Sequence, residues 1–265
     1  MTAPTGSSER SRHAKYLAEV HRKPYWLIDY DEIQRFFDGK KVCIVGSGPG
    51  SLKNEEGFID SHTVVRINNF KLGGNLGERT DVFYSFFGKS VRISHDMLKK
   101  TQLMMCKCPN DKIESKWHEQ MGMVYGSDWR WIYHYRRNFF KGPVYIPEKE
   151  DFLNYFNLLN KHIPTTGFSC ILDISRCNCE IYLTGFDFFK SRLHNVNELW
   201  KPKPREILDP IRHRPDLEWE WVNNNRDRFS MDEDLINALS SRIPVIPHEL
   251  KRYATRNNIP DVDIG

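Results

Sequence analysis

The chain has 265 residues, of which 39% are hydrophobic, 13% aromatic and 28% charged, and it is long enough to bury a core without a disulfide framework or a metal ion. This composition excludes a largely disordered chain and confines any disorder to the two ends. The net charge of +4 favours an anionic ligand or surface, but it is too small to indicate a nucleic-acid-binding protein.

The first part of the chain alternates between predicted helix and predicted strand. In "YDEIQRFFDGK", Ile33, Phe36 and Phe37 share one face of a short helix that Gly39 ends. The apolar segment "KVCIVG" follows, and two further extended segments, "HTVVRINNF" and "DVFYSFFG", flank the glycine-rich loop "KLGGNLGERT". This alternation predicts a single Rossmann-like α/β domain with a mainly parallel sheet flanked by helices.

The rest of the chain is less regular. Residues 101–147 interleave Trp, Tyr, His and Arg, so we expect an irregular cap or a ligand-contacting lid there. "PTTGFSCILDISRCNCEIYLTGFDFF" then predicts a helix capped by Thr165 or Thr166, followed by a strand. A polar stretch over 190–228 predicts loop and short helix, and the helix "MDEDLINALSSR" leads into the candidate strand "IPVIP". We expect a flexible segment over 1–24 and one domain over 25–265.

The turn "GSGPGS" after the first predicted strand has two interpretations. It is either a tight turn that packs a helix against the sheet, or a turn whose backbone N–H groups approach an anion. An ATPase-type phosphate loop needs Lys and then Ser or Thr directly after its last glycine, which "GSGPGSLK" lacks. A dinucleotide fold needs glycine where Ser51 stands and an acidic residue where the next strand ends in Asn68 and Asn69. An NAD(P) oxidoreductase is therefore disfavoured.

The cysteine pattern and the hydropathy indicate in which cellular compartment the chain is expected. Six cysteines in a chain of this size do not form a disulfide framework, and their C-x-C pairs lack the spacing of a zinc site, so we expect no bound metal. No segment approaches the roughly 20 apolar residues that cross a bilayer. We expect a cytoplasmic protein without a transmembrane segment, and peripheral contact with the inner face of a membrane is left open.

Four segments together resemble the motifs of the sialyltransferases. "CIVGSGPGSLKNEEGFIDSHTVVRINNFKLGGNLGERTD" resembles the large sialylmotif of the animal-type enzymes, and "IPTTGFSCILDISRCNCEIYLTGFDFF" resembles the small one and the corresponding segments of bacterial sialyltransferases. His194 falls where the family has its third motif, and "HRPDLE", from His213 to Glu218, matches the very small motif H-x-x-x-x-E. The four matches occur in the family's order and span most of the chain, from about 41 to 218.

Three features depart from the family pattern, of which the first is that "HNV" at His194 lacks the aromatic residue usual in the third motif. Ser47 replaces the usual Asn of the glycine turn, which removes one expected contact to ribose or phosphate. The animal enzymes join the large and small motifs by a disulfide, but Cys43, Cys177 and Cys179 are each displaced by one residue from those positions. A shift of one residue in a strand turns a side chain to the opposite face, so we expect free thiols here.

The resemblance implies a fold of the sialyltransferase variant of the GT-A type and an inverting, metal-independent transfer. The donor would be CMP-sialic acid or another CMP-ulosonic acid, the acceptor a hydroxyl of a glycan or glycolipid, and no cofactor would be needed. His213 is the candidate general base because imidazole titrates near neutral pH, and His194 is the candidate partner of the leaving phosphate. Glu218 would support the motif by orienting its backbone or the small-motif loop.

The donor-binding residues follow from the same motifs. The start of the predicted helix supplies N–H groups and hydroxyls for the donor carboxylate or phosphate, and the glycine turn and Asn68 would hold ribose and phosphate. Gly185 and Phe186 would border the cytidine. The full set is Gly46, Ser47, Gly48, Asn68, Thr165, Thr166, Gly167, Gly185 and Phe186. The alternatives are a CMP-Kdo-dependent transferase, an NAD(P) oxidoreductase, and a non-catalytic nucleic-acid module that uses the aromatic stretch 117–137.

Overall fold

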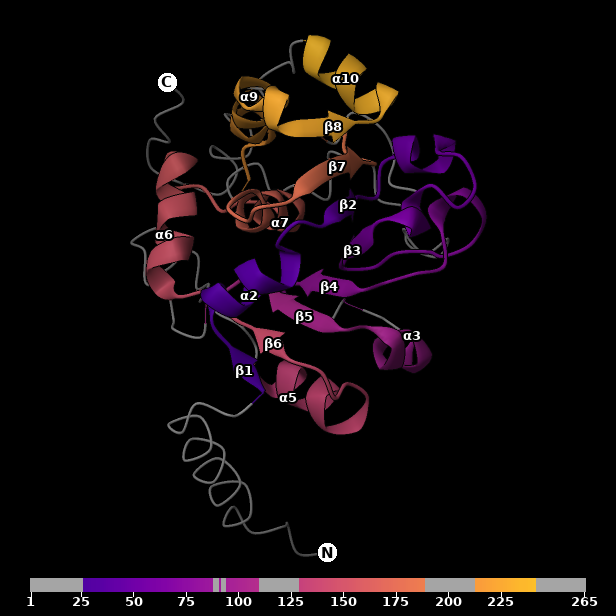
Figure 1. The fold of residues 1–265 in the computed structure, drawn as a ribbon. Coiled ribbons are helices and arrows are strands. Elements are labelled where there is room, and N and C mark those ends of the chain that lie inside the picture. The colour runs from indigo at the N-terminus through magenta and orange to yellow at the C-terminus, as the bar shows by residue number, and fades with distance from the viewer. Residues whose placement is uncertain (1–25, 88–90, 92–93, 110–128, 189–212, 242–265) are drawn as a thin grey trace, which may run out of the picture.

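The structure is a computed structural model that describes residues 26–87, 91, 94–109, 129–188 and 213–241. In these residues the chain forms one sheet of eight parallel strands in the order β1-β6-β5-β4-β3-β2-β7-β8 (Figure 1). The strands are β1 (Leu27–Ile28), β2 (Lys41–Val45), β3 (Thr63–Ile67), β4 (Val82–Ser85), β5 (Leu103–Cys106), β6 (Val144–Tyr145), β7 (Glu180–Thr184) and β8 (Phe229–Met231). The α/β fold with a parallel sheet is thus confirmed.

Helices cover both faces of the sheet, because alternate side chains of the buried strands point to opposite sides. One face packs against α2, α6, α7, α9 and α10, and the other packs against α3 and α5. These helices are α2 (Tyr30–Phe37), α3 (His95–Lys100), α5 (Trp129–Asn138), α6 (Lys149–Leu158), α7 (Thr166–Ser175), α9 (Pro215–Asn224) and α10 (Glu233–Ser240). In Figure 1 the sheet runs from β8 at the top to β1 at the bottom.

The prediction for residues 101–147 needs a correction. Two segments of this region, β5 and β6, are strands of the central sheet rather than parts of an irregular cap. All four β5 residues are buried, as is typical of a strand covered on both faces, but four apolar residues give no period that identifies a strand. β8 was also not predicted, because it is a three-residue strand at the edge of the sheet. The candidate strand "IPVIP" lies outside the described residues.

The order of the strands reverses beside β2. From β2 the chain adds β3, β4, β5 and β6 in one direction, and α7 then returns it so that β7 pairs with β2 on the other side. In open parallel sheets, ligands bind outside the carboxyl ends of the strands at such a reversal. The segments that follow β2, β3 and β7 are therefore where a ligand site is expected in this fold.

Cys43, Cys177 and Cys179 are free thiols, as predicted, and the other three cysteines form no disulfide either. Cys43 points from β2 into the apolar cluster with Val45 and Val64, whereas Cys177 packs into the cluster on the opposite face of the sheet. The two sulfur atoms are thus separated by the sheet, which is the physical reason why no bridge joins these two segments.

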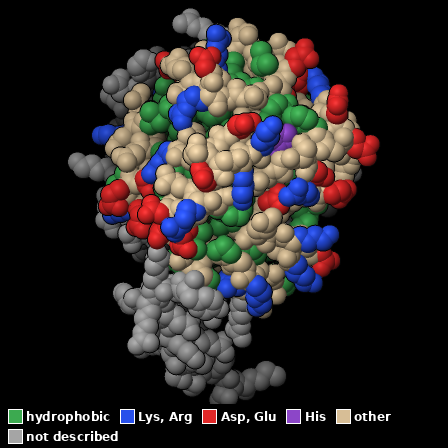
Figure 2. All heavy atoms as spheres, in the orientation of Figure 1, with side chains coloured by type: hydrophobic (Ala, Val, Ile, Leu, Met, Phe, Trp, Pro, Cys, Tyr) green, Lys and Arg blue, Asp and Glu red, His purple; other side chains and the backbone are tan. Residues whose placement is uncertain are grey.

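One face of the molecule carries mixed charge. On the face shown in Figure 2, Lys and Arg side chains alternate with Asp and Glu, and neither sign dominates. None of the helices in the described ranges is both long enough and apolar enough to span a bilayer.

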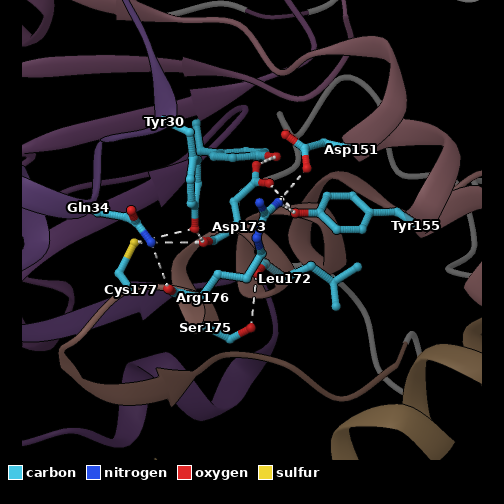
Figure 3. Close-up of polar contacts among 10 residues, drawn as sticks. Tyr30, Gln34, Asp151, Tyr155, Leu172, Asp173, Ser175, Arg176 and Cys177 are labelled. Carbon is cyan, nitrogen blue, oxygen red and sulfur yellow. Dashed lines mark hydrogen bonds and ion pairs between the residues drawn. The ribbon is translucent and has the colours of Figure 1, made fainter. Parts of the chain in front are cut away.

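A buried polar cluster holds α7 against its neighbours. The carboxylate of Asp173, which is fully buried, accepts hydrogen bonds from the hydroxyls of Tyr84 in β4 and Tyr155 in α6, each at 2.6 Å. Arg176 in turn donates to the Tyr155 hydroxyl at 3.1 Å and pairs with Asp151 at 2.8 Å (Figure 3). These contacts tie the carboxyl-terminal half of α7 to the sheet and to α6, and so fix the direction in which its first turn points.

The Asp173 cluster makes stability depend on pH. Burial raises the pKa of the Asp173 carboxyl from 3.8 to about 6, although the hydrogen bonds from Tyr155 and Tyr84 oppose that rise. The folded chain therefore binds this proton more tightly than the unfolded chain. Its contribution to stability is complete below pH 3.8 and is lost as the pH rises through about 6.

We therefore expect Asp173→Asn to remove this part of the pH dependence, because its neutral amide can still pair with both tyrosine hydroxyls. The difference between the two pKa values corresponds to about 3 kcal/mol of unfolding free energy. The measurement is urea unfolding of wild type and variant at several pH values between 4 and 8. Asp173→Ala, which leaves both hydroxyls unpaired, should be destabilised by about 2–4 kcal/mol. Identical pH profiles for wild type and Asp173→Asn would contradict the assignment.

Candidate functional site

The glycine turn after β2 packs directly against the loop after β7. The N–H group of Gly46 donates to the carbonyl of Thr184 at 2.8 Å, and that of Gly48 donates to the carbonyl of Gly185 at 2.7 Å. A Cβ atom at either glycine of the turn would lie within 2.8 Å of the Gly185 carbonyl oxygen. The packing interpretation of the turn thus holds at these two positions, and the expectation that their N–H groups bind an anion is corrected.

Phe186 joins this loop to the start of α7. Its ring lies between Gly46 and Gly167, since a Cβ atom at Gly46 would be 3.3 Å from the ring and one at Gly167 would be 2.9 Å from it. The ring therefore needs glycine at position 167 and is tightly packed at position 46, where the Gly185 carbonyl already requires glycine. The large and small motif segments are brought into direct contact at this ring.

Asn68 follows β3 at the same edge of the sheet. It has a φ of 49°, a left-handed conformation that Asn tolerates better than most residues. Its Oδ1 accepts hydrogen bonds from the Ser85 hydroxyl at 3.0 Å and from the Phe86 N–H at 3.4 Å, which fixes the orientation of the amide. The Nδ2 group has no partner among the residues that the structure describes, so it can donate to a ligand.

Thr165, and not Thr166, caps α7. Its Oγ1 accepts a hydrogen bond from the N–H of Phe168 at 3.2 Å, and it donates to Glu218 Oε2 at 2.8 Å. The Thr165 N–H donates to Glu218 Oε1 at 2.6 Å. Within the described ranges, no hydrogen bond is found for the N–H groups of Thr166 and Gly167, so these two are available to an anion at the positive end of the helix dipole.

His213 contacts the residues just before this cap. Its Nδ1 lies 2.7 Å from the carbonyl oxygen of Ile163. A carbonyl only accepts, so Nδ1 carries the hydrogen, and in the neutral ring Nε2 then carries the lone pair. His213 and Glu218, at the two ends of the H-x-x-x-x-E motif, thus hold residues 163 and 165 of the small-motif segment from one side.

Glu218 is buried in α9 with only 2% of its surface exposed. Burial raises the pKa of its carboxyl from 4.5 to about 7, while the hydrogen bonds from Thr165 and the charge of Lys107 lower it. Lys107 itself is 5% exposed and follows β5, where its N–H donates to the Ser85 carbonyl. This lysine belongs to none of the motif segments, and the sequence signal that marks it is a lone Lys in the otherwise apolar "LMMCKCP".

The remaining candidate residues lie partly inside and partly outside the described ranges. Ser47 lies in the turn between the two hydrogen-bonded glycines, while His194 and positions 117–128 of the aromatic stretch lie outside the described residues. Among the described residues, no three or more His, Cys, Asp and Glu side chains are grouped in a way that could hold a metal ion. The described donor-binding candidates lie after β2, β3 and β7 at the carboxyl edge of the sheet or at the start of α7, whereas His213 and Glu218 belong to the segment that leads into α9 and to α9 itself.

No protein-family model matches the chain, and no curated protein sequence matches it significantly. Among solved structures, it is similar to a mammalian sialyltransferase, with 16% identity and a TM-score of 0.47 over 75% of this chain and 70% of that one. It is similar to a mammalian sialyltransferase in complex with Gal-beta-1-3GalNAc-ortho-nitrophenol, with 16% identity and a TM-score of 0.44 over 75% of this chain and 71% of that one. It is also similar to the sialyltransferase CstII from Campylobacter jejuni in complex with a substrate analogue, cytidine-5'-monophosphate, with 16% identity and a TM-score of 0.49 over 83% of this chain and 99% of that one.

The capping assignment predicts a difference between two adjacent threonines. Thr165→Val removes the hydroxyl that caps α7 and donates to Glu218, so we expect the free energy of unfolding to fall by about 1–2 kcal/mol in urea titrations. Thr166→Val is the matched control, because its hydroxyl has no partner in the described part of the chain, and we expect a change within about 0.5 kcal/mol. Equal losses in the two variants would show that Thr165 is not the cap.

Proposed function

We propose that this chain is an inverting glycosyltransferase that moves sialic acid, or a related ulosonic acid, from a CMP-activated donor to a hydroxyl of an acceptor glycan or glycolipid. The observation that carries the proposal is the convergence of three separate sialylmotif-like segments at one edge of the sheet. The Phe186 ring joins the glycine turn to the start of α7, and His213 and Glu218 contact Ile163 and Thr165 just before that start. The glycine turn and the H-x-x-x-x-E motif, which are far apart in the sequence, thus both approach the start of α7.

The groups available there suit an anionic nucleotide sugar. In the proposal, the N–H groups of Thr166 and Gly167 bind the phosphate or the carboxylate of the donor, since both are anions and the start of a helix favours negative charge. Asn68 Nδ2 donates to ribose or phosphate. The N–H groups of Gly46 and Gly48 are already hydrogen-bonded to the loop after β7. In the proposal, the turn therefore contacts the donor through Ser47 and by its close fit, and not through a series of backbone N–H groups.

His213 is proposed as the general base. Its Nε2 takes the proton of the acceptor hydroxyl while the acceptor oxygen forms a bond to the anomeric carbon of the donor. On the opposite side of that carbon, the bond to the phosphate oxygen breaks and CMP leaves with the electron pair, so the configuration is inverted. The hydrogen bond from Nδ1 to the Ile163 carbonyl supports this role, because it holds the tautomer in which Nε2 is unprotonated. His194 remains the candidate to stabilise the leaving phosphate.

Glu218 is proposed to position the α7 start rather than to touch the substrate. Its pKa of about 7 means that a fraction of the molecules carry a protonated, neutral carboxyl near neutral pH. A neutral carboxyl at the helix start repels an anionic donor less than a carboxylate does. The charge of Lys107 lowers the pKa of Glu218 and so favours its carboxylate, but the same positive charge offsets the negative charge that ionisation creates.

The test is ligand binding and turnover with purified chain. We expect CMP, CMP-sialic acid or CMP-Kdo to raise the melting temperature, with EDTA present, and NAD and ATP to leave it unchanged. His213→Ala should keep its CMP affinity and lose at least about 100-fold in kcat, as expected for a general base. His162→Ala is the matched control, because the His162 ring contacts the carbonyls of Leu159 and Asn160 instead, and its turnover should be unchanged.

Other outcomes would favour other functions. Absence of a response to every CMP compound would reject the donor, and stabilisation by NAD would indicate an oxidoreductase. Salt-dependent binding of single-stranded RNA would indicate a nucleic-acid module. A preference for CMP-Kdo over CMP-sialic acid would keep the reaction and change the sugar.

A further inference from the structure

Asp232 connects the carboxyl-terminal part of the chain to the glycine turn, although it lies beyond the four motif segments. It is 7% exposed and stands between β8 and α10. Its Oδ1 accepts the N–H of Leu235 at 2.7 Å and so caps α10. Its Oδ2 accepts the Thr184 hydroxyl and the N–H of Gly185, each at 2.7 Å. One carboxylate thus serves both a helix and the loop after β7.

The same carboxylate also occupies the space beside Gly50. A Cβ atom at Gly50 would lie 2.6 Å from Asp232 Oδ2, so this position of the turn needs glycine for the carboxylate to approach. Thr184 Oγ1 extends the contact, because it accepts a hydrogen bond from Asn54 Nδ2 at 2.9 Å. Asn54 follows η1 (Pro49–Lys53), the 3-10 helix that leaves the turn. The turn therefore packs against the Asp232 carboxylate at Gly50 and is hydrogen-bonded to the Gly185 carbonyl at Gly48.

We propose that Asp232 is a positioning residue that holds the glycine turn and the β7 loop in the shape that receives the CMP half of the donor. This inference rests on the proposed function and adds a residue to its site. The loop after β7 bears the Gly185 carbonyl that binds the Gly48 N–H and the Phe186 ring that touches α7. Loss of the Gly185 and Thr184 contacts releases that loop and, through it, both motif segments.

The chemistry of the site separates this role from helix capping. Serine caps helices about as well as aspartate does, but its side chain is one atom shorter and offers a single oxygen. Asp232→Ser therefore keeps the cap of α10 and leaves the Gly185 N–H and the Thr184 hydroxyl without their acceptor. Asp29→Ser is the matched control, since Asp29 caps α2 through a 3.0 Å bond from the Glu32 N–H. Thr184→Val removes only the hydroxyl contact.

The experiment combines two readouts on the full chain. Amide hydrogen exchange, measured by mass spectrometry, should become at least tenfold faster over residues 46–54 in Asp232→Ser and remain unchanged there in Asp29→Ser. The Kd for CMP, measured by calorimetry, should rise at least tenfold in Asp232→Ser, by less in Thr184→Val, and by less than twofold in Asp29→Ser. The donor KM should rise with kcat within threefold of wild type, because ground state and transition state lose the same contacts.

The outcomes distinguish this inference from the function on which it rests. Unchanged exchange and unchanged CMP affinity in Asp232→Ser, in a chain that binds CMP, would overturn the role of Asp232 and leave the transferase intact. Failure of the wild-type chain to bind CMP would overturn the proposed function and the donor part of this proposal. Equal effects of Asp232→Ser and Asp29→Ser would also overturn it, since they would reflect helix capping in general.

Discussion

The hydrogen bonds from Thr165 to the carboxylate of Glu218 are the contact on which the candidate site depends. They join α9 to the first turn of α7 across 53 residues of sequence, and both oxygens of the carboxylate are used. Burial of this carboxyl is unfavourable for its charged form, which is why its pKa rises to about 7. A carboxyl whose pKa is raised this far by burial is more typical of a functional site than of a surface ion pair. The other end of α7 is held by Asp173, so the helix start has little freedom to move.

The glycines at this edge serve packing before they serve binding. Gly46 and Gly48 allow the Gly185 carbonyl to approach, Gly50 allows the Asp232 carboxylate to approach, and each would clash if it carried a Cβ atom. A glycine-rich turn after the first strand of an α/β sheet is usually interpreted as a phosphate cradle. Here the small residues let two loops and a helix start pack together, and among the described residues the proposal assigns the anionic donor to the N–H groups of Thr166 and Gly167 and to Asn68 Nδ2.

The sequence was sufficient to predict those elements whose apolar residues form long runs between clear boundaries. α2 and β2, β3, β4, α7, β7 and α10 were of this kind. β6 and β8 have two and three residues, so their assignment depends on neighbours in the sheet that a local pattern does not contain, and the four apolar residues of β5 give no period that identifies a strand. Within the site, motif order indicated Asn68, Thr165 and Glu218. Asp232 and Lys107 were not found, because burial and contact with distant loops are properties of the folded chain.

The central claim is that one edge of this sheet receives a CMP donor between the glycine turn and α7, and a crystal structure of the chain grown with CMP tests it most directly. The account predicts the nucleotide outside the carboxyl ends of β2 and β3, hydrogen-bonded to Asn68 Nδ2. It also predicts the phosphate within hydrogen-bonding distance of the N–H groups of Thr166 and Gly167. CMP bound at another face, or an edge that stays empty at saturating CMP, would contradict it.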